Sequence, residues 1–90
     1  MYYILLALTQ ECCGVDIMDR VRTLSMGRVT VGPGTLYAML AKFDEKEIIR
    51  LTASNGRRKS YVITDTGREE LRKEFLRLQT MVRDGAFYFE

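Results

Sequence analysis

Residues 27–40, GRVTVGPGTLYAML, change from one structural pattern to another within fourteen positions. Residues 28–31 have the β-branched character of a short strand or an extended connector. Pro33 suits the first turn of a helix, because its fixed φ and missing N–H cost nothing there, and Gly32 is an acceptable N-cap. The stretch therefore predicts an extended segment that leads directly into a helix over residues 33–46.

The predicted helix over residues 33–46 has two different faces. Leu36, Leu40 and Phe43 lie at positions i, i+4 and i+7, which places them on one apolar stripe toward the core. The residues that point away from this stripe are small or polar: Thr35, Ala38 and Lys42. Tyr37 lies on the flank between the two faces, where core packing and an exposed role fit its position equally well.

Two further helices are predicted earlier in the chain. Residues 2–9, YYILLALT, are apolar almost all round, which indicates a helix buried on most sides. Residues 15–25 carry apolar side chains at helical spacing and predict one buried face: Ile17, Met18, Val21 and Leu24. We expect these two helices to form the core on which helix 33–46 rests.

A basic β-hairpin is predicted after helix 33–46. Residues 48–53 and 58–63 are strand-like, and the Asn55-Gly56 pair between them is a strong hairpin signal. The net charge of the whole chain is only +2, yet residues 46–63 hold five Lys or Arg residues against one Glu. Three of these cations follow one another at the predicted tip: Arg57, Arg58 and Lys59. Such a tip attracts a polyanion locally, although the same three charges in an arbitrary hairpin would simply be a solvated turn.

A long amphipathic helix is predicted from residue 65 to residue 83. Its apolar residues follow at spacings of four, three and four, as in a heptad seam: Leu71, Phe75, Leu78 and Val82. At about 1.5 Å per residue, this helix would be roughly 28 Å long, which is more than a small core can cover. The seam therefore predicts a dimer interface, with folding back onto its own domain as the alternative. The aromatic end, Phe87-Tyr88-Phe89, would be either a further contact between subunits or a frayed terminus.

Composition excludes several classes of function. The 90 residues include no histidine, and the two cysteines, Cys12 and Cys13, are adjacent, so we expect reduced thiols, no zinc site and no cofactor. No nucleophile motif or glycine-rich phosphate loop of a nucleotide-binding enzyme is present, which argues against catalysis. No apolar run is long enough to span a membrane, so the expected location is the cytoplasm.

The order of the predicted elements is that of a winged helix-turn-helix domain. The fold class would be mainly α with a small β-hairpin wing (α+β), and residues 65–90 would add a C-terminal dimerisation helix and tail to a DNA-binding domain over residues 1–64. Helix 33–46 would enter the major groove, which is about 12 Å wide, and the wing at residues 54–59 would contact the backbone. A winged helix that contacts only proteins is the alternative, and preference for a palindromic promoter fragment over random DNA would separate the two.

Several motifs together resemble one family. Pro33-Gly-Thr-Leu-Tyr37 with Leu40, then Gly56-Arg-Arg-Lys59, Tyr61, Thr64, Gly67 and Arg68, are similar to the PadR family of transcriptional regulators. The resemblance implies a homodimer that reads a palindromic operator, often as a repressor relieved by a small molecule. Such an inducer would lie at the dimer interface, where Tyr2, Tyr3, Phe87 and Phe89 would either line its pocket or simply pack. The chain has Gly32 where members commonly have Ser or Thr, and Ala38 where a basic residue is frequent.

These patterns lead to two sets of predicted site residues. The DNA-contacting set lies on helix 33–46 and on the wing: Pro33, Gly34, Thr35, Tyr37, Ala38, Lys42, Arg57, Arg58 and Lys59. The dimer set is the heptad seam: Leu71, Phe75, Leu78 and Val82.

Overall fold

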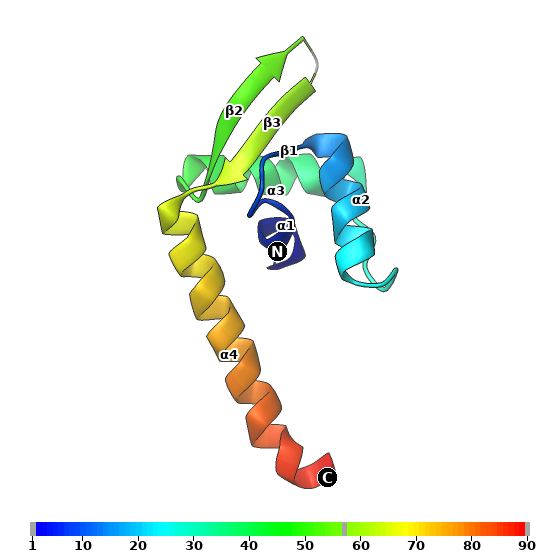
Figure 1. Ribbon diagram of the computed structural model, residues 1–90, viewed down its shortest axis with the longest axis vertical. Helices are drawn as coiled ribbons and strands as arrows, with labels where there is room; N and C mark the ends of the chain where they lie inside the picture. The colour runs from blue at the N-terminus through cyan, green and yellow to red at the C-terminus, as the bar shows by residue number, and fades with distance from the viewer. Residues whose placement is uncertain (1, 57, 90) are drawn as a thin grey trace.

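The computed structural model describes residues 2–56 and 58–89, which form four helices and a small antiparallel sheet (Figure 1). In chain order the elements are α1 (Tyr2–Ala7), β1 (Cys12–Cys13), α2 (Gly14–Leu24), α3 (Pro33–Glu45), β2 (Ile49–Asn55), β3 (Arg58–Ile63) and α4 (Asp65–Phe89). The β2–β3 hairpin and α4 extend toward opposite ends of the molecule, and α3 lies across the base of the hairpin. The predicted winged helix-turn-helix with an added C-terminal helix is confirmed.

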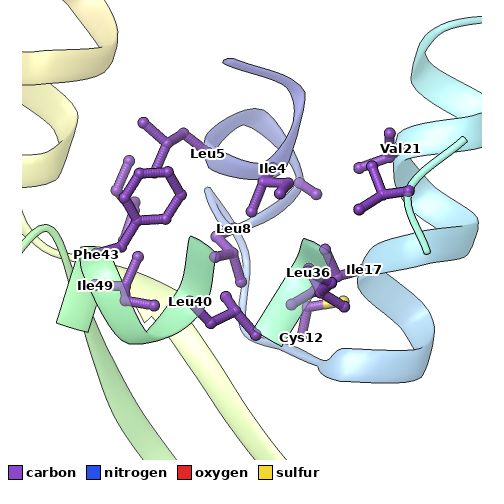
Figure 2. Close-up of a cluster of buried hydrophobic side chains, with 13 residues drawn as sticks. Ile4, Leu5, Leu8, Cys12, Ile17, Val21, Leu36, Leu40, Phe43 and Ile49 are labelled. Atoms are coloured by element: carbon purple, nitrogen blue, oxygen red, sulfur yellow. The ribbon is translucent and has the colours of Figure 1, made fainter. Parts of the chain in front are cut away.

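The core forms where α1, α2 and α3 meet the base of the sheet (Figure 2). The predicted stripe of α3 is buried, with Leu36 fully inaccessible and Leu40 and Phe43 at 2% and 8% exposure. Their buried neighbours come from α1, α2, β2 and β3 and include Ile4, Leu8, Ile17, Val21, Ile49 and Ile63. Burial of large aliphatic side chains contributes about 1.5–3 kcal/mol each, so this cluster is what fixes α3 in place.

The sheet contains a strand that the sequence did not reveal. β1 pairs with β3, so that Cys12 lies opposite Tyr61 and Cys13 opposite Ser60. Two residues are too short a strand to show an alternating pattern. The segment at residues 28–31 is a connector rather than a strand, since the Val29 N–H donates to the Ser25 hydroxyl at 2.9 Å.

One predicted core residue of α2 lies outside the core. Ile17 and Val21 are fully buried, and Met18 packs against them partly exposed, but Leu24 is 48% exposed. Leu24 instead borders an open pocket of about 380 Å³ between α1 and α2, which Leu6 and Ala7 line from the side of α1. Helical spacing correctly identified the apolar face of α2 but not which of its side chains are fully buried.

The junction before α4 connects the long helix to the rest of the domain. The Thr64 hydroxyl accepts a hydrogen bond from the Gly67 N–H at 3.0 Å, which makes Thr64 the N-cap. The Thr64 N–H donates to the Ile48 carbonyl at 2.9 Å, and the Arg68 guanidinium donates to the Thr9 carbonyl at 3.3 Å. The start of α4 is thereby held against both the base of the hairpin and the turn that follows α1.

The C-terminal part of α4 extends away from the domain and is more exposed than it would be if the helix packed back onto its own domain. It continues six residues beyond the predicted end at residue 83 to Phe89, a length of about 37 Å at 1.5 Å per residue. Leu71 still packs against the core, whereas Phe75 is 49% and Val82 73% exposed. The aromatic tail is therefore helical through Phe89, and beyond Leu71 the apolar seam is only partly covered within one protomer.

A Gly67→Ala substitution tests the junction. A Cβ at this position would overlap the carbonyl oxygen of Ile48 and lie 2.7 Å from Cγ1 of Ile63, so α4 would have to move off the hairpin. We expect the free energy of unfolding to fall by about 2–3 kcal/mol in urea titrations followed by circular dichroism. Gly34→Ala is the matched control, because no atom lies within 4 Å of its added Cβ, and it should be neutral or slightly stabilising. Equal stability of the two variants would contradict the proposed packing.

The buried thiol of Cys12 gives a second test. Burial raises the pKa of Cys12 above its usual value, with Asp16 and Cys13 adding to the rise and Arg20 opposing it, so the nucleophilic thiolate is scarce. In a Cys13→Ser protein, reaction of Cys12 with Ellman's reagent should be at least about tenfold slower when folded than in denaturant. The Cys12→Ser protein is the control, since Cys13 is only half buried. Rapid reaction of folded Cys13→Ser protein would contradict the burial of Cys12.

Candidate nucleic-acid interface

The N-terminus of α3 is open to solvent. Gly32 caps it in an extended conformation without any side-chain hydrogen bond, and its carbonyl accepts the Leu36 N–H at 2.9 Å. Pro33 occupies the first turn, and both Pro33 and Gly34 are exposed. The first N–H groups of a helix have no intrahelical acceptor and lie at the positive end of its dipole. This end of α3 can therefore accept an anionic group without steric hindrance from its own side chains.

The exposed side of α3 carries the predicted residues. Thr35, Ala38 and Lys42 are all exposed, on the side opposite to the buried stripe. No acidic residue occurs in α3 before Asp44. From its first turn to Lys42, the exposed side of α3 therefore consists of small side chains and one cation and carries no negative charge of its own, which suits close approach to a polyanion.

Tyr37 lies between α3 and the start of α2. Its side chain is 53% exposed, so it is not a core residue. A Cβ on Gly14 would lie 2.9 Å from the Tyr37 hydroxyl oxygen, which shows how closely the ring crosses the first residue of α2. The absence of a side chain at Gly14 therefore determines where Tyr37 can rest.

The wing presents its cations at a tight turn. Asn55 pairs with Arg58, Ser54 pairs with Lys59, and Gly56 adopts a φ of +61°, a conformation that favours glycine. Arg58 and Lys59 are exposed, whereas Arg57, the third predicted cation, lies outside the described residues. The strand β2 is also exposed along its length after Ile49. The wing is thus a projecting ribbon with positive charge near its tip.

A cleft of about 460 Å³ brings α3 and the wing together. It lies between the start of α2, one side of α3 and the strand β3, and its lining includes Tyr37, Asp44, Arg58, Lys59 and Tyr61. Burial raises the pKa of Tyr61, and the carboxylate of Asp44 and the hydroxyl of Tyr37 add to the rise, so its hydroxyl stays protonated and able to donate. Three residues of the predicted DNA-contacting set therefore border the same cleft.

The same cleft contains residues that sequence reasoning did not assign to it. Cys13, Gly14 and Val15 come from the end of β1 and the start of α2, and the Cys13 thiol donates to the Asp16 carboxylate at 3.1 Å. Pairing of β1 with β3 carries this segment to the cleft. β1 has only two residues, which is too few for a recognisable strand pattern. The sequence indicated this segment only through the extended residue expected just before the helix over residues 15–25.

The predicted dimer residues lie on a separate surface, along α4. Leu71 and Leu78 are half buried, while Phe75 and Val82 are largely exposed. Further large apolar side chains of the same helix are exposed as well: Leu76, Met81, Phe87, Tyr88 and Phe89. The structure brings the seam into one continuous helix, far from the wing tip (Figure 1).

Two other classes of site are not formed by the described residues. Within residues 2–56 and 58–89, no three Cys, Asp or Glu side chains gather in a way that would hold a metal ion. Over the same part of the chain, no helix combines the length and apolar character needed to cross a membrane.

Comparison with known proteins agrees with this geometry. A transcriptional regulator from Clostridium thermocellum superposes with a TM-score of 0.81 at 16% identity, over 99% of this chain and 90% of that one. A PadR family regulator from Clostridium difficile gives 0.77 at 20% identity, over 99% and 98% of the two chains. A PadR-like regulator from Bacillus cereus gives 0.73 at 25% identity, over 98% and 87%. These likenesses support the fold.

Similarity in sequence identifies the family. A stretch of 44 residues is 39% identical to an uncharacterized 37.1 kDa protein in a Streptomyces fradiae transposon, but it spans only 13% of that protein's length. The family model of PadR-like transcriptional regulators matches residues 4–73, which includes α3, the wing and the start of α4. The chain therefore belongs to the PadR-like family of transcriptional regulators.

Proposed function

We propose that this regulator is a homodimeric repressor that binds a palindromic operator with helix 33–46 in the major groove and the 54–59 wing on the phosphate backbone. The observation that carries the proposal is the shared cleft, because Tyr37 of α3 and Arg58 and Lys59 of the wing border it together. A helix and a basic ribbon on one side of a domain can contact a groove and the adjacent backbone at the same time.

The exposed side of α3 supplies the reading surface. Pro33, Gly34 and Ala38 allow the backbone to come close to base edges, and the N-terminal N–H groups would meet a phosphate. Thr35 and Lys42 are the side chains of this surface with hydrogen-bonding groups that can reach base edges or phosphates. Tyr37 would contact the backbone from the cleft.

The exposed seam of α4 supplies the reason for a dimer. Leaving Phe75 and Val82 in water is unfavourable, and a second copy of the same helix would cover both. A two-fold axis would place two α3 helices about one turn of DNA apart, roughly 34 Å, which is why the operator should be palindromic. Residues 1–64 would then bind DNA and residues 65–90 would hold the dimer. A small-molecule inducer at the dimer interface stays a prediction of the family resemblance.

Replacing Arg58 and Lys59 with alanine tests the role of the wing. We assume that each of the three cations at the tip neutralises one phosphate in each subunit. The logarithm of the binding constant, plotted against the logarithm of the salt concentration, then has a slope of up to about −5 for a dimer. Losing two cations per subunit makes this slope shallower by about 3 to 4. Binding is measured by fluorescence anisotropy at several salt concentrations, with DNA from immediately upstream of the gene that encodes the protein. Lys73→Ala/Arg83→Ala is the matched control, since it removes the same charge from α4, at the opposite end of the molecule (Figure 1).

Two results would contradict the proposed role in DNA binding. An unchanged slope in the Arg58→Ala/Lys59→Ala protein would remove the wing from the interface. Equal affinity of the native protein for the upstream fragment and for random DNA of the same length would favour the alternative, a winged helix that contacts proteins.

Replacing Thr35 with valine tests the reading helix. The change keeps the shape of the side chain and removes its hydroxyl, so discrimination between operator and random DNA should fall by about tenfold or more, while affinity for random DNA is unchanged. Thr66→Val is the control, because Thr66 occupies the exposed first turn of α4 instead. A uniform loss of affinity for both DNAs would mean that Thr35 contacts only the backbone.

A further inference from the structure

The seam of α4 continues farther than the four residues that first revealed it. The spacing of four and three that joins Leu71, Phe75, Leu78 and Val82 leads next to Gly85 and then to Phe89. The six positions form one heptad stripe along the whole helix. Gly85 is the exception in it, because every other member of the stripe is a large apolar residue.

Gly85 has no structural role within one protomer. It lies in the interior of an α-helix, where glycine costs about 1 kcal/mol relative to alanine. Among residues 2–56 and 58–89, and apart from the nearby backbone of α4 itself, no atom lies within 4 Å of the place where its Cβ would be. The described part of the protomer therefore does not require a small residue at position 85. Close approach of a second molecule would explain why glycine is present there.

We infer that two copies of α4 pack antiparallel in one register, in which Phe75 of each protomer occupies the space above the partner's Gly85. The inference rests on the homodimer of the proposed function and specifies its interface. A two-fold axis that pairs position 75 with position 85 also pairs 71 with 89 and 78 with 82. Each layer then joins one a-type and one d-type position, as an antiparallel coiled coil requires.

Other arrangements of the same stripe leave defects. A shift by one heptad in one direction places Gly85 opposite Val82, and a shift in the other direction places Phe75 opposite Leu78 and Gly85 opposite Arg68. In neither of them does Phe75 lie opposite the gap at Gly85. A parallel pair places Phe75 against the same residue of the partner and leaves a cavity between two glycines. The antiparallel register combines the largest side chain with the smallest, so it fills the space that the other arrangements leave empty or overfill.

The charges beside the stripe are compatible with this register. Arg72 and Glu74 are the charged residues that flank it, and they would come beside the partner's Ala86 and the partner's Tyr88, neither of which is charged. Glu74 is already paired with Arg77 of its own helix. Met81, 57% exposed in one protomer, would lie near the two-fold axis and be covered by the second helix. No like charges are brought together along the seam.

Exchange of the large and small residues tests the register. A Phe75→Ala protein has a cavity in both of the layers concerned, and a Gly85→Phe protein has two phenylalanines in each, so both homodimers should be at least about tenfold weaker than the native one. A mixture of the two variants forms a heterodimer with one phenylalanine in each layer. Native mass spectrometry of the equimolar mixture should show that heterodimer in excess, and sedimentation velocity should give a dissociation constant within about threefold of the native value.

The Phe75→Ala/Gly85→Phe double variant repeats the test without mixing. It has one phenylalanine per layer in a homodimer, so its dimer should also regain nearly native affinity. Both positions lie outside the buried core, and far-ultraviolet circular dichroism verifies that every variant keeps its helices.

The outcomes separate the register from the dimer itself. A native protein that is monomeric at micromolar concentration overturns the proposed homodimer and the register with it. A native dimer with neither heterodimer excess nor recovery in the double variant overturns the register alone. A tighter dimer in Gly85→Phe alone would identify the parallel arrangement and also overturn the register.

Discussion

Burial of one side of α3 is the interaction on which the rest of the structure depends. Leu36, Leu40 and Phe43 are held between α1, α2 and the base of the sheet, and nearly all of their surface is removed from water. Because side chains at i, i+4 and i+7 share one face of a helix, fixing these three also fixes the opposite face. Thr35, Lys42 and the open N-terminus are directed outward for that reason, whether or not DNA is present.

A second constraint transmits this arrangement to both ends of the molecule. The backbone of Ile48 follows α3 directly and lies against Gly67, while its carbonyl accepts the Thr64 N–H. The contact of Ile48 with Gly67 and Thr64 consequently orients both the wing and α4 relative to α3. In a dimer held by α4, the same contact would set the spacing between two reading helices.

The sequence was informative wherever a pattern ran for several turns. The stripe of α3 and the heptad positions of α4 repeat a period long enough to be recognised, and Asn55-Gly56 is a specific signal for a hairpin turn. The structure has the corresponding elements. The sequence was uninformative where structure depends on a neighbour. β1 is two residues long and exists because β3 lies beside it, and Leu24 is exposed because α1 and α2 leave an open pocket between them. Cys13 and Gly14 lie in the cleft because β1 pairs with β3. Their position could not be predicted from the sequence because β1 itself could not.

The glycines that lie in helices indicate where another group approaches the helix backbone closely. Gly14 begins α2 and makes room for the ring of Tyr37, and Gly67 makes room for the backbone of the hairpin, so both are explained within the protomer. Gly34 and Gly85 also lie in helices but have open space around them. Glycine in a helix costs up to about 1 kcal/mol relative to alanine, so a close neighbour that would clash with a Cβ is a reason to have it there. One of these two lies at the open end of the proposed reading helix and the other in the seam of α4, so the two helical glycines with open space around them lie on the two surfaces proposed to bind partners.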